Sequence, residues 1–369
     1  MSVSYGGSSI TFEDGSIVSS GSAGFKNKII NGAMTIDQRN GGASVTTTTS
    51  GAYNLDRWNN NNNSGASRFT VQQISGDAPA EFAYYLGCTS SGAYSIASGD
   101  VLLIRQIIEG FNIIDLAWGT ANAKTITLSF WVRSSLTGTF GGSIKNPNAA
   151  YSYPFTYTIN QANTWEKETI IIPGPTASTW NTSNLGGVEL NLSLGTGSEY
   201  AGAAGSWSAN DYRSASGTTS VVATNGATWQ LTGVQLEKGT TASSFEFRSI
   251  QKELMLCQRY LPAFIAQSGT VGPLPGSATA LGTGSVLIFN HPVPARVPGT
   301  GVGVSAVTHF NFSNNDGNSP STAVSFAAGS PDATQLSITV ASSRGATTTP
   351  GWFYANNTAA RLYITGCEL

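Results

Sequence analysis

The chain has 369 residues, of which 18 are Lys or Arg and 20 are Asp or Glu, so its formal net charge is −2. Only 10% of the residues are charged, yet 8 Trp, 13 Tyr and 16 Phe are far more aromatic residues than a disordered chain keeps. The aliphatic runs are short, and none approaches the ~18–20 apolar residues of a membrane-spanning helix. The near-neutral charge removes the basic face that nucleic acid requires. We therefore expect neither disorder, membrane insertion nor nucleic-acid binding.

Residues 1–24 form an arm rich in Gly and Ser around one short alternating segment. An arm of this size cannot bury a core of its own, so we expect it to order only against another protein. Its apolar residues Ile10, Phe12 and Ile17 are the candidates for that contact.

Residues 25–248 consist of short apolar segments between turns rich in Gly, Asn, Ser and Pro. In residues 124–133 and 188–194 every second side chain is apolar, the pattern of a strand with one buried face. Further strand-like segments follow the same rules at residues 151–157, 168–172 and 228–236. Because no amphipathic helix separates these segments, the pattern predicts an all-β domain with an antiparallel sandwich.

Residues 249–262 have the pattern of a helix, with Ser249 as N-cap and Pro262 at the end. The apolar residues of this helix are spaced 4, 3 and 4 apart, the average of 3.5 that coiled-coil packing requires. They are Ile250, Leu254, Cys257 and Leu261. This spacing is compatible with an oligomer interface and with a linker helix that packs on its own sandwich, because under two heptads do not separate the two.

Residues 263–369 return to loops rich in Gly and Pro. Short strand-like segments follow at residues 285–289, 302–312, 336–340 and 361–365. We expect a second, smaller β-sandwich domain here, with the C-terminus tied into a sheet.

The residue pattern gives little indication of a metal or cofactor site. Cys88, Cys257 and Cys367 are odd in number and have no metal-ligand spacing, so we expect buried free thiols. His291 and His309 are too few for a histidine-rich zinc site. No phosphate-binding loop or nucleophile elbow is present. The sequence predicts no metal, no cofactor and no catalytic residue.

Several motifs of the chain resemble those of bacteriophage tail-fibre and minor virion proteins. They occur in the order typical of that family, at residues 27–39, 53–58, 128–134, 164–166, 229–239, 245–248 and 256–260. The most specific match is residues 229–239, which read WQLTGVQLEKG. Within the arm, residues 10–16 resemble a motif found near the N-termini of phage fibres. The C-terminal domain matches only in general character.

The resemblance implies a jelly roll similar to carbohydrate-binding modules for residues 25–248. It implies a homotrimeric virion fibre or spike that recognises a host cell-surface polysaccharide, with the arm attached to other virion proteins. On this interpretation the helix supplies the trimer interface. A head-decorating or purely structural fibre without a receptor role is the alternative, and the sequence leaves open which β domain binds the receptor.

Glycan binding needs aromatic rings that stack on sugar C–H faces, together with amide and carboxylate groups. The densest group of such side chains lies in residues 198–213. The candidate glycan-binding residues are Trp131, Tyr151, Tyr153, Tyr200, Trp207, Asp211 and Tyr212. The alternative is that the aromatic residues cover the sandwich or a subunit interface.

Some phage fibres cleave the polymer that they bind, so a depolymerase is a third hypothesis. Glycoside hydrolysis needs two carboxylates about 5–9.5 Å apart. Candidates are Asp100, Glu109, Asp115, Glu189, Glu199 and Asp211. Because the repeats of a depolymerising β-helix are absent, we expect a binding protein and not an enzyme.

Overall fold

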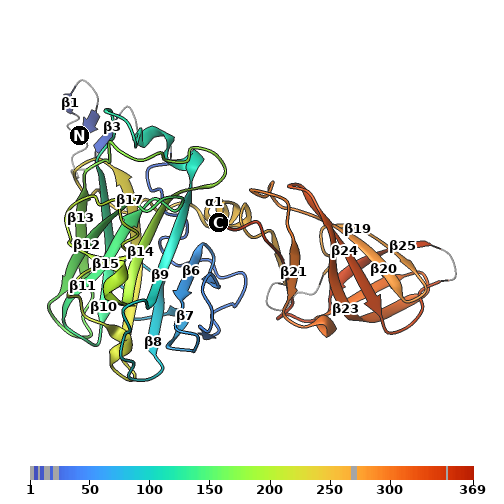
Figure 1. Ribbon diagram of the computed structural model, residues 1–369. Helices are drawn as coiled ribbons and strands as arrows, with labels where there is room; N and C mark the ends of the chain where they lie inside the picture. Colours follow the sequence, from blue (N-terminus) through green and yellow to red (C-terminus); the bar gives the residue numbers. More distant parts are fainter. Residues whose placement is uncertain (1–3, 7–8, 12–16, 20–24, 267–271, 346–347) are drawn as a thin grey trace.

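The computed structural model describes residues 4–6, 9–11, 17–19, 25–266, 272–345 and 348–369. Figure 1 shows two β-rich bodies with the helix α1 (Ile250–Gln258) between them. Within the described residues the fold is all-β apart from α1 and short 3₁₀ helices, as the sequence predicts. The arm contributes a three-stranded antiparallel sheet of β1 (Ser4–Gly6), β2 (Ser9–Thr11) and β3 (Ile17–Ser19).

The larger body is a sandwich of two six-stranded antiparallel sheets. The first sheet has the order β13 (Glu166–Ile172), β10 (Ile126–Ser134), β17 (Thr228–Lys238), β8 (Tyr84–Ser90), β7 (Phe69–Ser75) and β4 (Val45–Thr46). The second sheet has the order β12 (Ser152–Ile159), β11 (Gly138–Lys145), β14 (Gly186–Thr196), β9 (Val101–Glu109), β6 (Trp58–Asn62) and β5 (Tyr53–Leu55). The chain crosses between the sheets repeatedly, which gives the jelly-roll sandwich that we expected.

Alternating side chains build the sandwich core. Ile126, Leu128 and Phe130 of β10 are fully buried between the sheets, as their period of two predicts. One polar pair lies inside this core, where Trp229 Nε1 donates to the Tyr157 hydroxyl at 3.0 Å. A buried polar group without such a partner would be costly, so this pair lets two large rings pack in the core.

Loops of the sandwich carry the remaining short elements. The 3₁₀ helices η1 (Gly110–Leu116), η2 (Ser198–Tyr200) and η3 (Val221–Ala223) lie between its strands. After β14, the short strands β15 (Ala201–Gly202) and β16 (Ser214–Ala215) pair in parallel. The loop that contains them, residues 197–216, lies against the second sheet and becomes important for the site.

The C-terminal body is a closed barrel, which corrects the expected sandwich. Its strand order is β19 (Gly276–Leu281), β20 (Gly284–Asn290), β24 (Ala333–Val340), β23 (Gly317–Gly329), β22 (Phe310–Asn314) and β25 (Thr349–Ala355). Closure occurs because β25 pairs with β19 through its first residues and with β22 through its last. A sheet of β18 (Ala263–Ile265), β26 (Arg361–Thr365) and β21 (Gly301–Val304) shares the barrel core.

Residues 302–312, expected to be one strand, are divided between β21 and β22. The 3₁₀ turn η4 (Val307–His309) separates the two strands. The division lets β21 pair with β26 while β22 enters the barrel. The segments expected at residues 285–289, 336–340 and 361–365 do form strands.

Helix α1 begins after Ser249, whose side chain accepts a hydrogen bond from the Lys252 backbone at 3.3 Å. The helix packs on its own chain. Cys257 is buried against Ile30 and Tyr260, and the cluster they form anchors the helix to the jelly roll.

This packing corrects part of the expected trimer interface. Cys257 and Leu261 are buried within the chain, and Leu261 lies beyond the helix end, so neither side chain is presented to a neighbouring subunit. Leu254 is half-buried against the same cluster, whereas Ile250 is 53% exposed. The 3.5-residue spacing therefore describes, for the most part, how the helix packs on its own chain.

An ion pair and several hydrogen bonds join the two bodies. Arg39 Nη2 lies 2.8 Å from Glu368 Oε2, and both side chains are largely buried. Arg296 Nη1 donates to the Asn184 carbonyl at 2.8 Å. These contacts come from residues far apart in the sequence, and they place the chain end beside α1 (Figure 1).

Candidate functional site

The outward face of the second sheet carries a row of polar side chains. Leu190 and Leu192 of β14 belong to the sandwich core. Because successive side chains of a strand point to opposite faces, Glu189, Asn191 and Ser193 lie on the outward side. They are nevertheless almost completely buried, which is unusual for polar residues on the outside of a sheet.

Strand register extends this row across four strands. Asn59 of β6 lies opposite Arg105 of β9, which lies opposite Asn191 of β14, which lies opposite Ser143 of β11. Arg105 Nε donates to Asn59 Oδ1 at 2.7 Å. Asn191 Nδ2 donates to Ser143 Oγ at 3.2 Å. We call Asn59, Arg105, Ser143, Lys145, Glu189 and Asn191 the polar face.

Charged groups of both signs lie at the polar face. Arg105 Nη1 is 3.5 Å from Glu189 Oε1. Lys145 Nζ is 2.5 Å from Asp211 Oδ1, and Arg213 Nη2 is 2.9 Å from Asp211 Oδ2. The Lys145 side chain is only 5% exposed and that of Glu189 4%, so these ions have little contact with solvent. The ion pairs attach the loop of residues 197–216 to the sheet.

Asp211 stays ionised in this setting. Burial pushes the pKa of its carboxyl group upward, but hydrogen bonds and charge from Lys145 and Arg213 outweigh burial and hold the pKa below its ordinary range. The carboxylate is therefore a permanent acceptor for two cations, and it links the loop to β11.

Several buried polar atoms of this region lack a hydrogen-bond partner among the described residues. The clearest are Asn191 Oδ1, Arg213 Nε and Ser214 Oγ. Glu189 Oε1 also accepts no hydrogen bond there, although Arg105 is near it. Buried polar groups in proteins are nearly always hydrogen-bonded. A mixed set of donors and acceptors, held in place but unsatisfied, is what a polar ligand or ordered water would complete.

The loop of residues 197–216 approaches the sheet closely. A side chain at Gly141 of β11 would lie 2.5 Å from Ser214 Oγ, so only glycine fits beneath the loop. Ser152 Oγ donates to the Asn210 carbonyl at 2.7 Å and accepts from the Tyr212 backbone at 3.1 Å. The loop is thus positioned by both main-chain and side-chain contacts.

Four of the predicted glycan-binding residues lie on this loop, and three of them, all except Trp207, hold it in place. Asp211 makes the ion pairs described above, and Tyr200 lies beneath the Arg213 guanidinium, whose carbon is 5.6 Å from the ring centroid. The Tyr212 ring packs against Gly202. The structure brings these three side chains to the border of the polar face, but all three are engaged in holding the loop.

Three other candidates belong to an aromatic cluster. Tyr151 and Trp207 stack with ring centroids 5.4 Å apart and an interplanar angle of 6°. Tyr153 lies 5.4 Å from Trp207 and is almost fully buried, because it shares a strand face with core residues. Trp118 and Trp180 complete the cluster. These rings pack against one another and cover the sandwich, which is the alternative that the sequence left open for the aromatic residues.

Trp131 lies apart from the other candidates. It is half-buried on β10 of the first sheet, near Phe82 and Gly233. Since the polar face belongs to the second sheet, the structure does not bring Trp131 to it.

Sequence reasoning missed Asn59, Arg105, Lys145 and Asn191 as a group. One signal was present, because Arg105 interrupts the otherwise apolar beginning of β9. The partners of Arg105 come from strands far away in the chain, so only the register identifies the row.

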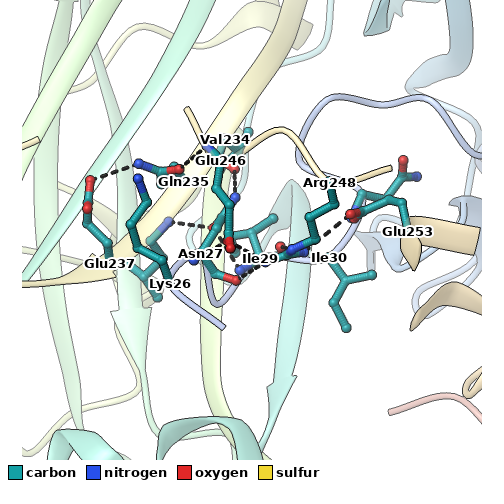
Figure 2. A network of polar contacts seen from close by, with 12 residues as sticks. Lys26, Asn27, Ile29, Ile30, Val234, Gln235, Glu237, Glu246, Arg248 and Glu253 are labelled. Carbon is teal, nitrogen blue, oxygen red and sulfur yellow. Dashed lines mark hydrogen bonds and ion pairs between the residues drawn. The ribbon is translucent and has the colours of Figure 1, made fainter. Parts of the chain in front are cut away.

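The motifs that carry the family resemblance form a separate structural network (Figure 2). Asn27 donates from its side chain to the Val234 carbonyl at 3.0 Å and accepts from the Leu236 backbone at 3.0 Å. Arg248 lies between Glu246, at 3.0 Å, and Glu253, at 3.3 Å. The network ties the first segment, the last sandwich strand and α1 together, so these residues maintain the fold.

The described part of the chain does not meet the requirements of a metal site, a disulfide or a membrane-spanning helix. No group of three or more His, Cys, Asp or Glu residues there is arranged to hold a metal ion. All three cysteines are free and buried, as predicted. Among the described helices, none has the length and apolar character needed to cross a bilayer.

No protein-family model matches the chain, and no curated protein matches it by sequence. Among solved structures, the enzymatically active domain of bacteriophage CBA120 tailspike protein 4 is similar to 58% of this chain and 21% of that chain, at 12% identity and a TM-score of 0.30. A CBM4 structure matches 57% of this chain and 98% of its own, at 15% identity and a TM-score of 0.31.

A family 11 carbohydrate-binding module from Clostridium thermocellum matches 54% of this chain and 98% of its own, at 11% identity and a TM-score of 0.27. At such TM-scores the likenesses carry no argument about ligand or activity. The assignment of function rests on the polar face itself.

Proposed function

We propose that the chain is a carbohydrate-binding structural protein that attaches a phage-like virion to a host cell-surface glycan. The observation that carries this proposal is the polar face together with the adjoining loop of residues 197–216. Buried acceptors of the face, Asn191 Oδ1 and Glu189 Oε1, and buried groups of the loop, Arg213 Nε and Ser214 Oγ, are fixed in position without being saturated. Sugar hydroxyl groups both donate and accept hydrogen bonds, so they complement such a mixed set.

The charges at the polar face suit a hydroxylated ligand. Arg105 and Lys145 are already paired with carboxylates, so neither is a free anion-binding cation. Groups held in ion pairs still accept or donate further hydrogen bonds, and charge-assisted hydrogen bonds are stronger than neutral ones. A glycan hydroxyl group that reaches these side chains therefore gains hydrogen bonds without having to break an ion pair.

Binding without cleavage is favoured by two of the carboxyl groups that are candidates for a catalytic pair, Asp211 and Glu109. A glycosidase needs one carboxyl group with a raised pKa to act as general acid. The pKa of Asp211 is held down by Lys145 and Arg213, and Arg259 and Tyr260 likewise hold down the pKa of Glu109, in each case against the effect of burial. A depolymerase would release reducing ends from host polysaccharide, and their appearance would overturn this part of the proposal.

The virion location rests on the sequence motifs. The arm is the segment that attaches to other virion proteins, and Ile10 and Ile17 lie in its strands β2 and β3, whereas Phe12 lies outside the described residues. Antibody labelling of particles, viewed by electron microscopy, tests this location. Label on the head would favour the alternative of a head-decorating fibre.

The exposed side of α1 supports assembly as a homotrimer. Phe247, Ile250 and Met255 are each more than half exposed. A hollow of about 250 Å³ lined in part by Phe82 lies beside Ile250, and another of about 540 Å³ beside Met255. Phe247 and Ile250 line the first hollow together, and an exposed apolar pair of this kind is typical of an interface. A monomeric mass in light scattering of the intact protein would contradict assembly.

The glycan proposal is tested by binding of the labelled protein to host cells and to polysaccharide extracted from them. We expect Arg105→Met to abolish binding, because it removes the central donor of the row while keeping a side chain of similar length. Arg68→Met is a control, since Arg68 stacks on Tyr94 away from the row. Equal binding by wild type and Arg105→Met would overturn the polar face as the site, and loss with both would indicate a general fault in folding.

A further inference from the structure

The barrel presents an aromatic surface of a different kind. Along β25, Phe353 and Ala355 are buried in the barrel core, so the alternation of the strand turns Trp352 and Tyr354 outward. Trp352 is 51% exposed, whereas the other seven of the eight tryptophans are buried or half-buried. In Figure 1, β25 lies on the side of the barrel away from the jelly roll.

The neighbours of these two rings are neutral and polar. In the register of β22 and β25, Asn311 lies opposite Tyr354 and Ser313 lies opposite Trp352. On the other side of β25, Pro273 forms a bridge with Tyr354 and is exposed. The surface therefore combines a tryptophan, a tyrosine and a proline with the Asn311 amide, whereas Ser313 is buried.

A chain of hydrogen bonds orients the polar groups. Asn356 Nδ2 donates to Asn311 Oδ1 at 2.7 Å, and Asn311 Nδ2 donates to the Tyr354 hydroxyl at 3.0 Å. Because the Tyr354 oxygen accepts this bond, its own proton is free to be donated outward. Asn356 is exposed and retains its side-chain carbonyl as an acceptor. Donor and acceptor thus lie beside the ring faces.

No ionised side chain pairs with this surface among the described residues. The ring of His309 is hydrogen-bonded to Ser305, and the carboxylate of Asp316 and the guanidinium of Arg344 contact the turn that follows β22. A surface without charge offers nothing to an anionic or cationic ligand. It suits a neutral ligand that has apolar faces and hydroxyl edges at the same time.

We infer that Trp352 and Tyr354 form a second carbohydrate-binding surface, which takes neutral hexose oligosaccharides by stacking their C–H faces on the rings. Side chains two residues apart on a strand are separated by about 6.8 Å, so a disaccharide can cover both rings while Asn356 and the Tyr354 hydroxyl bind its hydroxyl groups. This surface is independent of the polar face, which lies on the other body.

Titration of the intact protein with neutral gluco-, galacto- and manno-oligosaccharides, followed by saturation-transfer NMR, tests the inference. We expect Trp352→Ala to weaken binding about tenfold or more and Trp352→Phe to restore part of the affinity. Phe111→Ala is the matched control, because Phe111 is an equally exposed aromatic residue, at 55%, on the jelly roll. It should leave the affinity unchanged.

Three results would overturn the inference. The first is a wild-type protein that binds none of the oligosaccharides. The second is binding that Trp352→Ala leaves unchanged, and Arg105→Met in the same titration tells whether that binding belongs to the polar face. The third is a fall in oligomeric mass with Trp352→Ala in light scattering, which would make the ring a contact between protein chains.

Discussion

The jelly roll and the barrel differ in the charge and the solvent exposure of the side chains at their candidate sites. On the jelly roll, the ion pair between the buried Lys145 and the partly exposed Asp211 holds the loop of residues 197–216 on the sheet. On the barrel, Trp352 and Tyr354 lie on an uncharged outer surface above a core that they do not help to build.

Binding and stability are therefore connected differently in the two bodies. In the jelly roll the residues that would contact a ligand also stabilise the fold, so a change at the site costs stability. In the barrel the core lies beneath the site, so the site can change freely. Substitutions in the two bodies should differ accordingly in their effect on stability.

The strongest test of the barrel core is Phe353→Ala. Phe353 is adjacent to Trp352 but points inward, where it stacks on Phe310 with centroids 5.4 Å apart. Removing a buried phenyl ring leaves a cavity and should lower the free energy of unfolding of the barrel by about 3–5 kcal/mol. Calorimetry of the intact protein should show the barrel transition moved and the jelly-roll transition in place. A change below about 1 kcal/mol would mean that the strand faces are assigned wrongly.

A smaller loss is expected for Asp211→Asn in the jelly roll. The substitution leaves the buried Lys145 ammonium without its counter-ion, and breaking such a pair costs about 2–3 kcal/mol of unfolding free energy when one partner is partly exposed. Denaturant unfolding measures it. Asp77→Asn is the control, because Asp77 pairs with Arg133 at 2.6 Å but is 80% exposed, and its loss should be below about 1 kcal/mol. Equal losses of unfolding free energy for the two variants would refute the conclusion that the Lys145 ammonium is shielded from solvent.

Acid should weaken the jelly roll through the same carboxylate. The pKa of Asp211 is lower in the folded chain than in the unfolded one, since Lys145 and Arg213 outweigh burial. Ionised Asp211 therefore stabilises the fold above its unfolded pKa of about 3.9, and this contribution is lost as the pH falls through the folded pKa. Melting temperatures recorded between pH 6 and pH 2 should fall for wild type and fall less for Asp211→Asn. If the melting temperatures of the two proteins fell in parallel with pH, Asp211 would not be the group responsible for the loss of stability in acid.

The smallest effect on stability is expected for Trp352→Ala. Its ring is half exposed and no core residue depends on it, so unfolding free energy should change by less than about 0.5 kcal/mol. A loss of unfolding free energy comparable to that of Phe353→Ala, measured in the same calorimeter, would show that Trp352 stabilises the barrel. The two bodies would then not differ in how the site contributes to stability.

Local pattern was enough to predict much of the fold. The alternation in residues 124–133 and 188–194 predicted strands β10 and β14 with the correct buried faces. Ser249 predicted the start of α1. Each of these features depends on neighbours within a few residues, and such neighbours are visible in a sequence.

The site depends on longer-range relations. Asn59, Arg105 and Asn191 meet because three strands pair in one register, and no local pattern fixes that register. The closing of the barrel by β25 is equally non-local. Trp352 and Phe353 are both large aromatic residues, so alternation alone does not tell which of them points outward. The aromatic residues chosen from composition were, for the most part, those that pack the jelly roll.

The decisive experiment for two separate carbohydrate-binding surfaces is a glycan array probed with the intact protein, Arg105→Met and Trp352→Ala. We expect wild type to bind, and each variant to lose signal for glycans that the other variant retains. A wild-type protein that binds no glycan would refute the two surfaces, and so would two variants that both keep the full wild-type profile.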